Sequence, residues 1–455
     1  MFCYNSFMEH TFFFYDLETS GLSPRTDRIM QFAGQRTTMD LEPIGEPVNI
    51  LIKLANDTLP SPDAIMVTGI TPQSTQQDGL TEAEFCQYVM NEIFTPGTIA
   101  CGYNSVHFDD EHMRYCFWRN FYDPYEWQWK DGRSRWDMLD VIRMTRALRP
   151  EGINWPVTED GKATNRLELI TKENGIFHEN AHDALADVNA LIDVTRLIRD
   201  KQPQIYNYLF KIRDKKAIQQ LINLANPAPF VHSGSRCSGS ARTSVFFPIA
   251  PGENGNVLIF DLRYNLDEYL ADPTKNSVGI KELKYNRCPA VSPISVLDQK
   301  DGWAKIDLNK ATVEKNLQSL LAHPDFVERA REEFYQGEDF PPAPDSESAL
   351  YDGFLDEVDK TSCKAITRAG LNDLADFHPE FHDPRLEDLL LHYKARNFEN
   401  ALSESEHAAW EKYRIERIKN SANAYIKRIQ ELAAEGADSF LLEELQLWYQ
   451  SLMPY

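Results

Sequence analysis

Thr11-Phe-Phe-Phe-Tyr-Asp-Leu-Glu-Thr-Ser-Gly21 is the stretch that decides the fold of this chain. Its apolar and aromatic residues predict a strand buried on both faces, yet the strand ends in two acids, Asp16 and Glu18. Because strand side chains alternate with period two, both carboxylates point the same way. Two like charges about 5 Å apart repel by roughly 3 kcal/mol at an effective dielectric of about 20. A cation or a shared proton must offset this repulsion, and we interpret the strand end as a site for divalent metal.

A third acid, Asp109, follows a second predicted strand, Thr98 to Gly102. It falls at a predicted strand-to-helix junction, ahead of an aromatic-rich helix that runs through Phe121. Such junctions often carry site residues in α/β proteins, but Asp is also an ordinary helix N-cap. Taken alone, Asp109 leaves both interpretations open.

The segment Asn180-Ala-His-Asp-Ala-Leu-Ala-Asp187 is the second strong signal. Asp183 is a predicted N-cap, which makes His182 a loop residue just before a helix. On the helical wheel, Asp187 lies within an apolar stripe made by Ala184, Leu191, Val194 and Ile198. A carboxylate on an apolar helix face must be paired, protonated or bound to metal. A buried Asp187 satisfied by hydrogen bonds, and a structural His182, are the alternatives.

The four acids and the histidine are more specific together than any one of them. Oxygen ligands without a soft Cys/His cluster favour Mg²⁺ or Mn²⁺. Several carboxylates beside a histidine fit two-metal hydrolysis of a phosphodiester. His182 would accept the proton of the attacking water, since histidine changes charge near neutral pH.

These residues resemble the conserved site of the DEDDh superfamily of 3′→5′ exonucleases. The chain is also similar to the bacterial exonuclease I family. The similar stretches occur in the same order as in that family and extend along nearly the whole chain. The stretches that carry this likeness are Gly69-Ile-Thr-Pro-Gln73, Phe121-Tyr-Asp-Pro-Tyr125, Arg135-Trp-Asp-Met-Leu-Asp-Val141, Ala147-Leu-Arg-Pro-Glu-Gly-Ile-Asn-Trp-Pro156, Ala181-His-Asp-Ala-Leu-Ala-Asp187, Asn286-Arg-Cys-Pro-Ala290 and Tyr393-Lys-Ala-Arg-Asn-Phe398.

The resemblance implies a fold that begins with an α/β, RNase H-like DEDDh exonuclease domain over residues 8–200. An SH3-like β-rich domain with a helical connector would follow over residues 201–345, and a C-terminal helical domain over residues 350–455. The implied activity is metal-dependent 3′→5′ hydrolysis of single-stranded DNA to 5′-mononucleotides, in DNA repair and recombination. An exonuclease that acts on RNA and a non-catalytic module that binds DNA ends or a partner are the alternatives.

Carried over by position, the resemblance assigns the catalytic site to Asp16, Glu18, Asp109, His182 and Asp187. Asp16, Glu18 and Asp187 would hold the metal, with Asp109 assisting and His182 acting as general base. Two Mg²⁺ ions are expected, with Mn²⁺ as a substitute.

The same resemblance assigns substrate contacts to Glu18 and Arg166. It places Arg149 and Tyr208 in a docking region for the acidic C-terminal tail of single-stranded DNA-binding protein. One departure is Leu17, where members of the family often have Tyr. We expect this change to alter packing beside the terminal nucleotide.

Length and composition set broad limits on the molecule. A chain of 455 residues is too long for one core and predicts two to four domains. No apolar run is long enough to span a bilayer, and residues 1–10 lack an export signal. Seven scattered cysteines indicate a protein of the reducing cytosol. The lack of a Cys-x-x-Cys motif argues against a structural zinc site. We expect a bacterial cytoplasmic monomer that does not associate with membranes.

The net charge of −23 is unfavourable for contact with nucleic acid, but binding depends on local basic surface. Residues 130–149 hold six Lys/Arg against three acids, and residues 196–216 hold seven against two. Trp127, Trp129 and Trp136 are interleaved with the first of these runs, which is typical of a surface that binds single strands. Ordinary core tryptophans and a solvated charged face are the alternatives.

Overall fold

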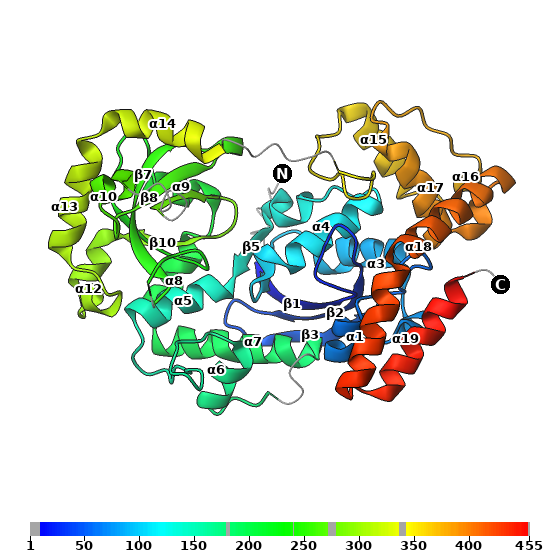
Figure 1. The fold of residues 1–455 in the computed structure, drawn as a ribbon, viewed down its shortest axis with the longest axis horizontal. Coiled ribbons are helices and arrows are strands. Elements are labelled where there is room, and N and C mark those ends of the chain that lie inside the picture. The colour runs from blue at the N-terminus through cyan, green and yellow to red at the C-terminus, as the bar shows by residue number, and fades with distance from the viewer. Residues whose placement is uncertain (1–9, 179–182, 240, 272–278, 336–342, 454–455) are drawn as a thin grey trace, which may run out of the picture.

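The computed structural model describes residues 10–178, 183–239, 241–271, 279–335 and 343–453. Figure 1 shows a central part in blue and cyan, built on one sheet, with a second sheet on its left in green. Helices from the C-terminal third of the chain, in orange and red, lie on its right. Among the helices in these ranges, none combines the length and apolar character that crossing a membrane requires.

The first sheet has five strands in the order β3-β2-β1-β4-β5, with the opening aromatic stretch as its central strand. β1 and β3 pair antiparallel with β2, whereas β4 pairs parallel with both β1 and β5. The strands are β1 (Thr11–Thr19), β2 (Ile29–Thr37), β3 (Pro43–Leu51), β4 (Thr98–Gly102) and β5 (Ser134–Asp137). The helices of this part are α1 (Pro62–Thr68), α2 (Pro72–Asp78), α3 (Glu82–Tyr88), α4 (Asp109–Arg119), α5 (Met138–Leu148), α6 (Leu167–Glu173), α7 (Ala184–Lys201), α8 (Pro203–Lys211) and α9 (Lys215–Leu221).

Alternate residues of β1 face two different cores. Phe12 and Phe14 pack in the core that includes the apolar residues of α5, α7 and α8. Phe13, Tyr15 and Leu17 pack on the other side, with apolar residues of α3 and α4. The sheet is therefore covered on both faces, as the continuous apolar run predicts.

The second sheet has the order β10-β6-β7-β8-β9, and every neighbouring pair is antiparallel. Its strands are β6 (Phe230–Ser233), β7 (Thr243–Pro251), β8 (Val257–Asp261), β9 (Ile280–Leu283) and β10 (Ala290–Pro293). The helices that accompany it are α10 (Leu266–Ala271), α12 (Gly302–Lys305), α13 (Lys310–Leu321) and α14 (Pro324–Tyr335). Apolar residues of β7, β8 and α13 share one core with α5 and α7, so this part packs directly on the first.

The C-terminal part is helical and packs on the first part in two places. Its helices are α15 (Glu357–Ile366), α16 (Leu371–Ala375), α17 (Arg385–Asn397), α18 (Glu404–Glu435) and α19 (Ser439–Leu452). One core joins α17 to Tyr115 and Trp118 of α4. Another joins α18 and α19 to Met30, Leu54 and Ile65.

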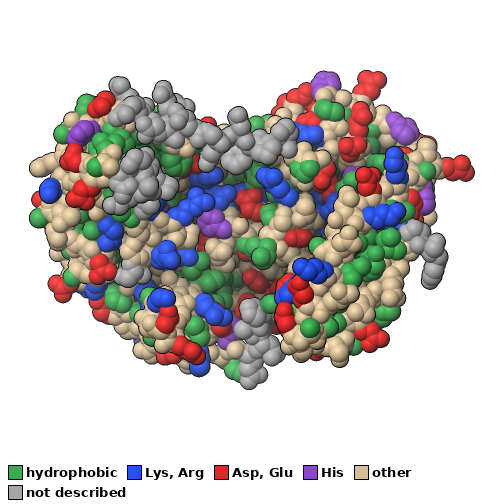
Figure 2. All heavy atoms as spheres, viewed as in Figure 1, with side chains coloured by type: hydrophobic (Ala, Val, Ile, Leu, Met, Phe, Trp, Pro, Cys, Tyr) green, Lys and Arg blue, Asp and Glu red, His purple; other side chains and the backbone are tan. Residues whose placement is uncertain are grey.

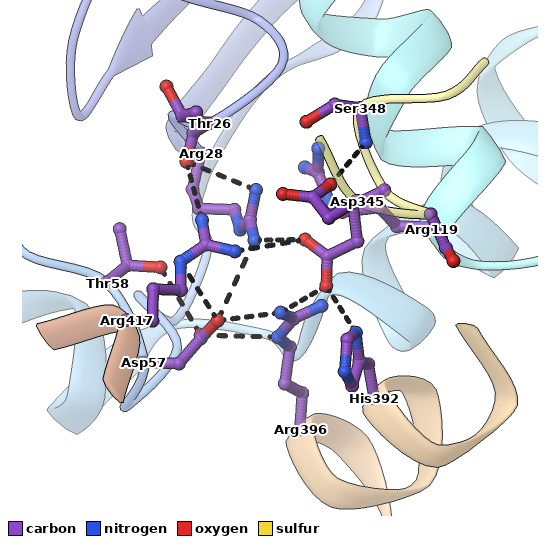
Figure 3. A network of polar contacts seen from close by, with 12 residues as sticks. Thr26, Arg28, Asp57, Thr58, Arg119, Asp345, Ser348, His392, Arg396 and Arg417 are labelled. Carbon is purple, nitrogen blue, oxygen red and sulfur yellow. Dashed lines mark hydrogen bonds and ion pairs between the residues drawn. The ribbon is translucent and has the colours of Figure 1, made fainter. Parts of the chain in front are cut away.

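A buried network of charges lies at the second of these contacts (Figure 3). Arg28, which precedes β2, pairs with Glu347 at 2.7 Å. Arg396 of α17 pairs with Asp57 at 2.7 Å and with Glu347 at 2.5 Å. Arg417 of α18 lies 3.5 Å from both carboxylates. The network therefore ties segments around residues 28 and 57 to the C-terminal helices through three arginines and two acids.

Burial alone would raise the pKa of Glu347, but Arg396 and Arg28 overcome this and hold it well below its usual range. A depressed carboxyl pKa stabilises the fold above the pKa of the unfolded chain, and this contribution is lost as the pH falls through the folded value. Docking of the C-terminal helices is therefore expected to weaken in acid.

We predict that Glu347→Gln lowers the free energy of unfolding by about 3–5 kcal/mol, because it leaves three arginines to share the single counter-charge of Asp57. Urea denaturation followed by circular dichroism measures the change. Lys427→Ala is the control, because its partner Glu431 lies 3.4 Å away in an exposed pair. Equal stability of Glu347→Gln and the wild-type protein would contradict the role given to this network.

Candidate metal centre

Asp16 and Glu18 lie at the end of β1, on the strand face that is turned toward α7. They continue the alternation of Phe12 and Phe14, while Leu17 between them is buried on the opposite face with 4% of its surface exposed. The pairing of β1 with β2 shifts register between Glu18 and Thr19. Such bulges often lie beside active sites because they redirect a side chain at a strand end.

Asp187 reaches the same place from the first turn of α7. Asp183 caps this helix by accepting a hydrogen bond from the backbone N–H of Ala186 at 3.0 Å, as the sequence predicts. One ligand atom from each of Asp16, Glu18 and Asp187 lies within 4.8 Å of the others. The structure thus brings together three carboxylates that the sequence separates by about 170 residues.

Asp109 is the first residue of α4 and belongs to the same acidic centre, although it lies outside the group of three. Its side chain is 4% exposed, and its Oδ1 atom is buried without a hydrogen-bond partner. Burial and the charge of Asp110 raise the pKa of Asp109 to about 8. A buried carboxylate oxygen without a donor is a position at which a cation would be stabilised.

Mutual repulsion also perturbs the two acids of β1. Burial raises the pKa of Glu18 to about 8, and the charges of Asp187 and Asp109 add to the shift. Burial, followed by the charges of Asp109 and Glu18, raises the pKa of Asp16 well above its usual range. These hard oxygen donors in an electronegative environment suit a divalent cation such as Mg²⁺ or Mn²⁺.

His182, the expected general base, lies outside the residues that the structure describes. A different histidine, His178, contacts the centre through Nε2, which lies 2.6 Å from Oδ1 of Asp187. No periodic pattern marks His178 in the sequence, because it lies in the loop between α6 and α7. Only the folded structure reveals its contact with Asp187.

Two more acids of α4 have contacts that sequence reasoning missed. Asp110 accepts a hydrogen bond of 2.5 Å from the hydroxyl of Tyr15 and pairs with Arg135. Arg135 in turn donates to the backbone carbonyl of Asn286, which follows β9 of the second sheet. Three consecutive acids, Asp109-Asp110-Glu111, stand at the start of this helix, whereas an N-cap needs only one. The two additional acids were the sequence signal for these contacts.

Glu111 joins three parts of the chain. It accepts hydrogen bonds from Arg114 at 2.8 Å, from Arg287 near the second sheet at 3.1 Å, and from Tyr351 of the C-terminal part at 2.5 Å. The flanking parts therefore meet on α4, two residues from Asp109.

The remaining predicted residues lie on or beside α5, α6 and α8, outside the group of three acids. Arg166 is the N-cap residue of α6, and its exposed side chain pairs with Glu168 at 2.5 Å. Arg149 ends α5 and Tyr208 lies on α8, where both are half-buried. Leu17 packs in the core with α3 and α4, and its effect on packing beside the terminal nucleotide stays a prediction.

The three tryptophans of the basic run have different environments. Trp127 and Trp136 are core residues with 1% and 2% of their surface exposed, so a stacking role is wrong for them. Trp129 is 64% exposed. Figure 2 shows Lys and Arg side chains gathered around the hollow in the middle of the molecule, between the second sheet and the C-terminal helices.

Comparison with protein families gives three matches in order along the chain. Residues 13–195 match the family described as exonuclease, residues 213–336 match the exonuclease I SH3-like domain, and residues 344–452 match the exonuclease I C-terminal domain. The predicted fold class, with an α/β exonuclease domain, an SH3-like domain and a helical C-terminal domain, is confirmed.

Similar proteins cover nearly the whole chain. Exodeoxyribonuclease I of Haemophilus influenzae is 38% identical over 97% of both chains, and that of Escherichia coli is 37% identical over 94% of both. The crystal structure of E. coli exonuclease I with a dA16 oligonucleotide has a TM-score of 0.93 and 36% identity, covering 98% of this chain and 100% of that one.

Two further structures of relatives matter for the site. A zinc-bound complex of E. coli exonuclease I with single-stranded DNA has a TM-score of 0.91, and a complex of exonuclease I with single-stranded DNA-binding protein and an inhibitor has one of 0.89. Each is 34% identical and covers 98% of this chain and 100% of that one.

We predict that without metal the protein loses stability as the pH rises from about 5 to about 9. Carboxyl groups whose pKa is raised by folding stabilise the fold below the unfolded value, near 4, and lose this effect as the pH passes the folded value, about 8 for Glu18 and Asp109. Added Mg²⁺ should raise the melting temperature most at pH 8–9, and scanning calorimetry with EDTA or Mg²⁺ measures both effects.

Glu18→Gln is the matched variant for this pH dependence, because it removes one titrating group and keeps the side-chain shape. Its metal-free stability should vary less with pH than that of the wild-type protein. An identical pH dependence in both would show that the centre is not the source of the effect.

Proposed function

This chain belongs to the exodeoxyribonuclease I family, and from that premise we propose that its acidic centre hydrolyses single-stranded DNA from the 3′ end and releases 5′-mononucleotides. The observation that carries the proposal is the convergence of Asp16, Glu18 and Asp187, whose ligand atoms lie within 4.8 Å of one another. Family membership makes the chain a 3′→5′ exonuclease. We further propose a role in DNA repair and recombination.

The centre fits a divalent metal, and we propose two Mg²⁺ ions. Asp16, Glu18 and Asp187 would hold them, and the unpartnered Oδ1 of Asp109 supplies a further donor. Bound ions of this kind supply positive charge to the phosphate and lower the pKa of an attacking water. The protein contributes a fixed set of oxygens, because β1 is packed on both faces and α7 is anchored on the same core.

His182 is proposed as the general base by resemblance to the family. A histidine there would accept the proton of the attacking water without adding a further negative charge to the centre. The N-cap at Asp183 supports this role, because it begins the helix that carries Asp187, and His182 directly precedes this cap in the sequence.

Two exposed side chains are proposed to contact the strand. Arg166 has 66% of its side chain exposed, and its guanidinium is a donor for phosphate. Trp129, 64% exposed beside Lys130, offers an aromatic face for a base. Glu18 is proposed to contact the terminal nucleotide in addition to the metal.

The docking region for single-stranded DNA-binding protein is proposed to include Arg149 and Tyr208. They lie on neighbouring helices, α5 and α8, and both remain partly exposed. An arginine side chain provides a cation that suits the carboxylates of an acidic tail. We further propose a cytoplasmic monomer, in keeping with the free cysteines found among the described residues.

We predict that the protein shortens an end-labelled single-stranded DNA from its 3′ end, that EDTA abolishes this activity, and that Asp187→Ala removes nearly all of it. Removing one carboxylate leaves the metal with too few ligands. Lys427→Ala, which changes an exposed ion pair, is the control and should keep the activity. Gel analysis of mononucleotide release from matched DNA and RNA, single- and double-stranded, measures the activity and the substrate preference. Faster degradation of RNA than of the matched DNA would support an exonuclease that acts on RNA. Absence of mononucleotide release from any substrate would support a non-catalytic binding module.

We predict that Trp129→Ala raises the KM for single-stranded DNA about 5–150-fold, because base stacking on an aromatic ring contributes about 1–3 kcal/mol. Steady-state kinetics on an oligonucleotide measures the effect. Phe440→Ala on α19 is the control, because this aromatic side chain is similarly exposed, at 63%. Equal KM values for Trp129→Ala and the wild-type protein would exclude Trp129 from the strand path.

A further inference from the structure

His178 is held at both ring nitrogens in a nearly buried position. Its side chain is 3% exposed, and Nε2 lies 2.6 Å from Oδ1 of Asp187. Its Nδ1 lies 3.1 Å from the hydroxyl oxygen of Thr171 on α6. An imidazole ring bound at both ends can neither rotate nor slide without breaking a hydrogen bond.

The second anchor of this ring is itself rigid. Thr171 is fully buried, and its hydroxyl donates to the backbone carbonyl of Glu168 at 2.9 Å. Leu167 and Ile170 of the same helix lie in the core that includes α7. His178 therefore connects Thr171 of α6 with Asp187 of α7, two helices that are packed against each other.

Asp187 needs such a contact because of its neighbours. Its charge raises the pKa of Glu18 and that of Asp16, which means that the three carboxylates repel one another. The Asp187 side chain is 21% exposed, so repulsion would favour its rotation toward solvent. The contact of His178 with Oδ1 opposes this rotation, because turning the carboxylate away would break it.

We propose that His178 is a positioning residue that fixes the carboxylate of Asp187 for metal binding. This inference rests on the proposed function, because it takes Asp187 as a metal ligand. Hydrogen-bond partners of metal ligands typically change metal affinity 10–100-fold when they are removed. His178 is distinct from the general base, since both of its nitrogens are engaged and neither is available to a water.

The experiment measures Mn²⁺ binding to the full-length protein by electron paramagnetic resonance of the free ion, in parallel with activity at increasing Mn²⁺. His178→Ala should raise the Kd for Mn²⁺ about 10-fold or more and raise the Mn²⁺ concentration for half-maximal activity by the same factor. The kcat at saturating Mn²⁺ should stay within about twofold of wild type, because affinity is lost while the chemistry is retained.

Two further variants separate positioning from loss of structure. His178→Gln should restore most of the affinity, because its amide places a donor close to the position of Nε2. Thr171→Val removes the second anchor while keeping shape, and should weaken Mn²⁺ binding less than His178→Ala. Both variants test the proposal even if His178→Ala fails to fold, which thermal melting detects.

His382→Ala is the matched control, because His382 pairs with Asp356 at 2.7 Å in the C-terminal part, away from the centre. It should bind Mn²⁺ as wild type does. An unchanged Kd in His178→Ala overturns the proposal, as does a fall in kcat at saturating metal with Kd unchanged. Asp187→Ala distinguishes failure of the proposed metal site from failure of the role of His178. If Asp187→Ala also binds Mn²⁺ normally, the proposed metal site is wrong. If Asp187→Ala loses binding and His178→Ala does not, only the role of His178 fails.

Discussion

Repulsion among three half-buried carboxylates is the constraint on which the rest of this structure depends. Asp16, Glu18 and Asp187 lie within 4.8 Å of one another, and burial with mutual charge raises the pKa of the first two. Such a cluster persists only if the backbones that carry it cannot move apart. The aromatic strand β1 meets this need, because its side chains fill a core on each face of the sheet and one of these cores also holds α7.

The two outer parts of the chain attach close to this cluster, on the helix that carries Asp109. Glu111 accepts hydrogen bonds from Arg287 beside the second sheet and from Tyr351 of the C-terminal part. Movement of either outer part is therefore transmitted to α4. The arrangement fixes both outer parts relative to the acidic centre. The buried network of Figure 3 fixes the C-terminal helices in the same frame.

Sequence patterns predicted what local periodicity encodes. The alternation of side chains along a strand predicted that Asp16 and Glu18 lie on one side of it. The apolar stripe of the helix predicted that Asp187 faces the core. The contact of His178 with Asp187 was missed because a loop residue has no period, and burial of Trp127 was undecided because composition does not separate a core aromatic from an exposed one. The bonds of Glu111 join residues 176 and 240 positions apart, and no local rule reaches that distance.

The cost of the acidic centre also bears on whether the chain is a catalyst or a binding module. A module that only binds DNA would be more stable if one carboxylate were replaced by an apolar or amide side chain, because an unpaired buried charge is among the most destabilising features of a core. This chain instead places three acids around one point and leaves the Oδ1 atom of the neighbouring Asp109 without a donor. It also provides His178 to hold the partly exposed carboxylate of Asp187 in place. Such an arrangement is stable only with protons or cations bound, which favours a metal-dependent hydrolase over a module that only binds DNA.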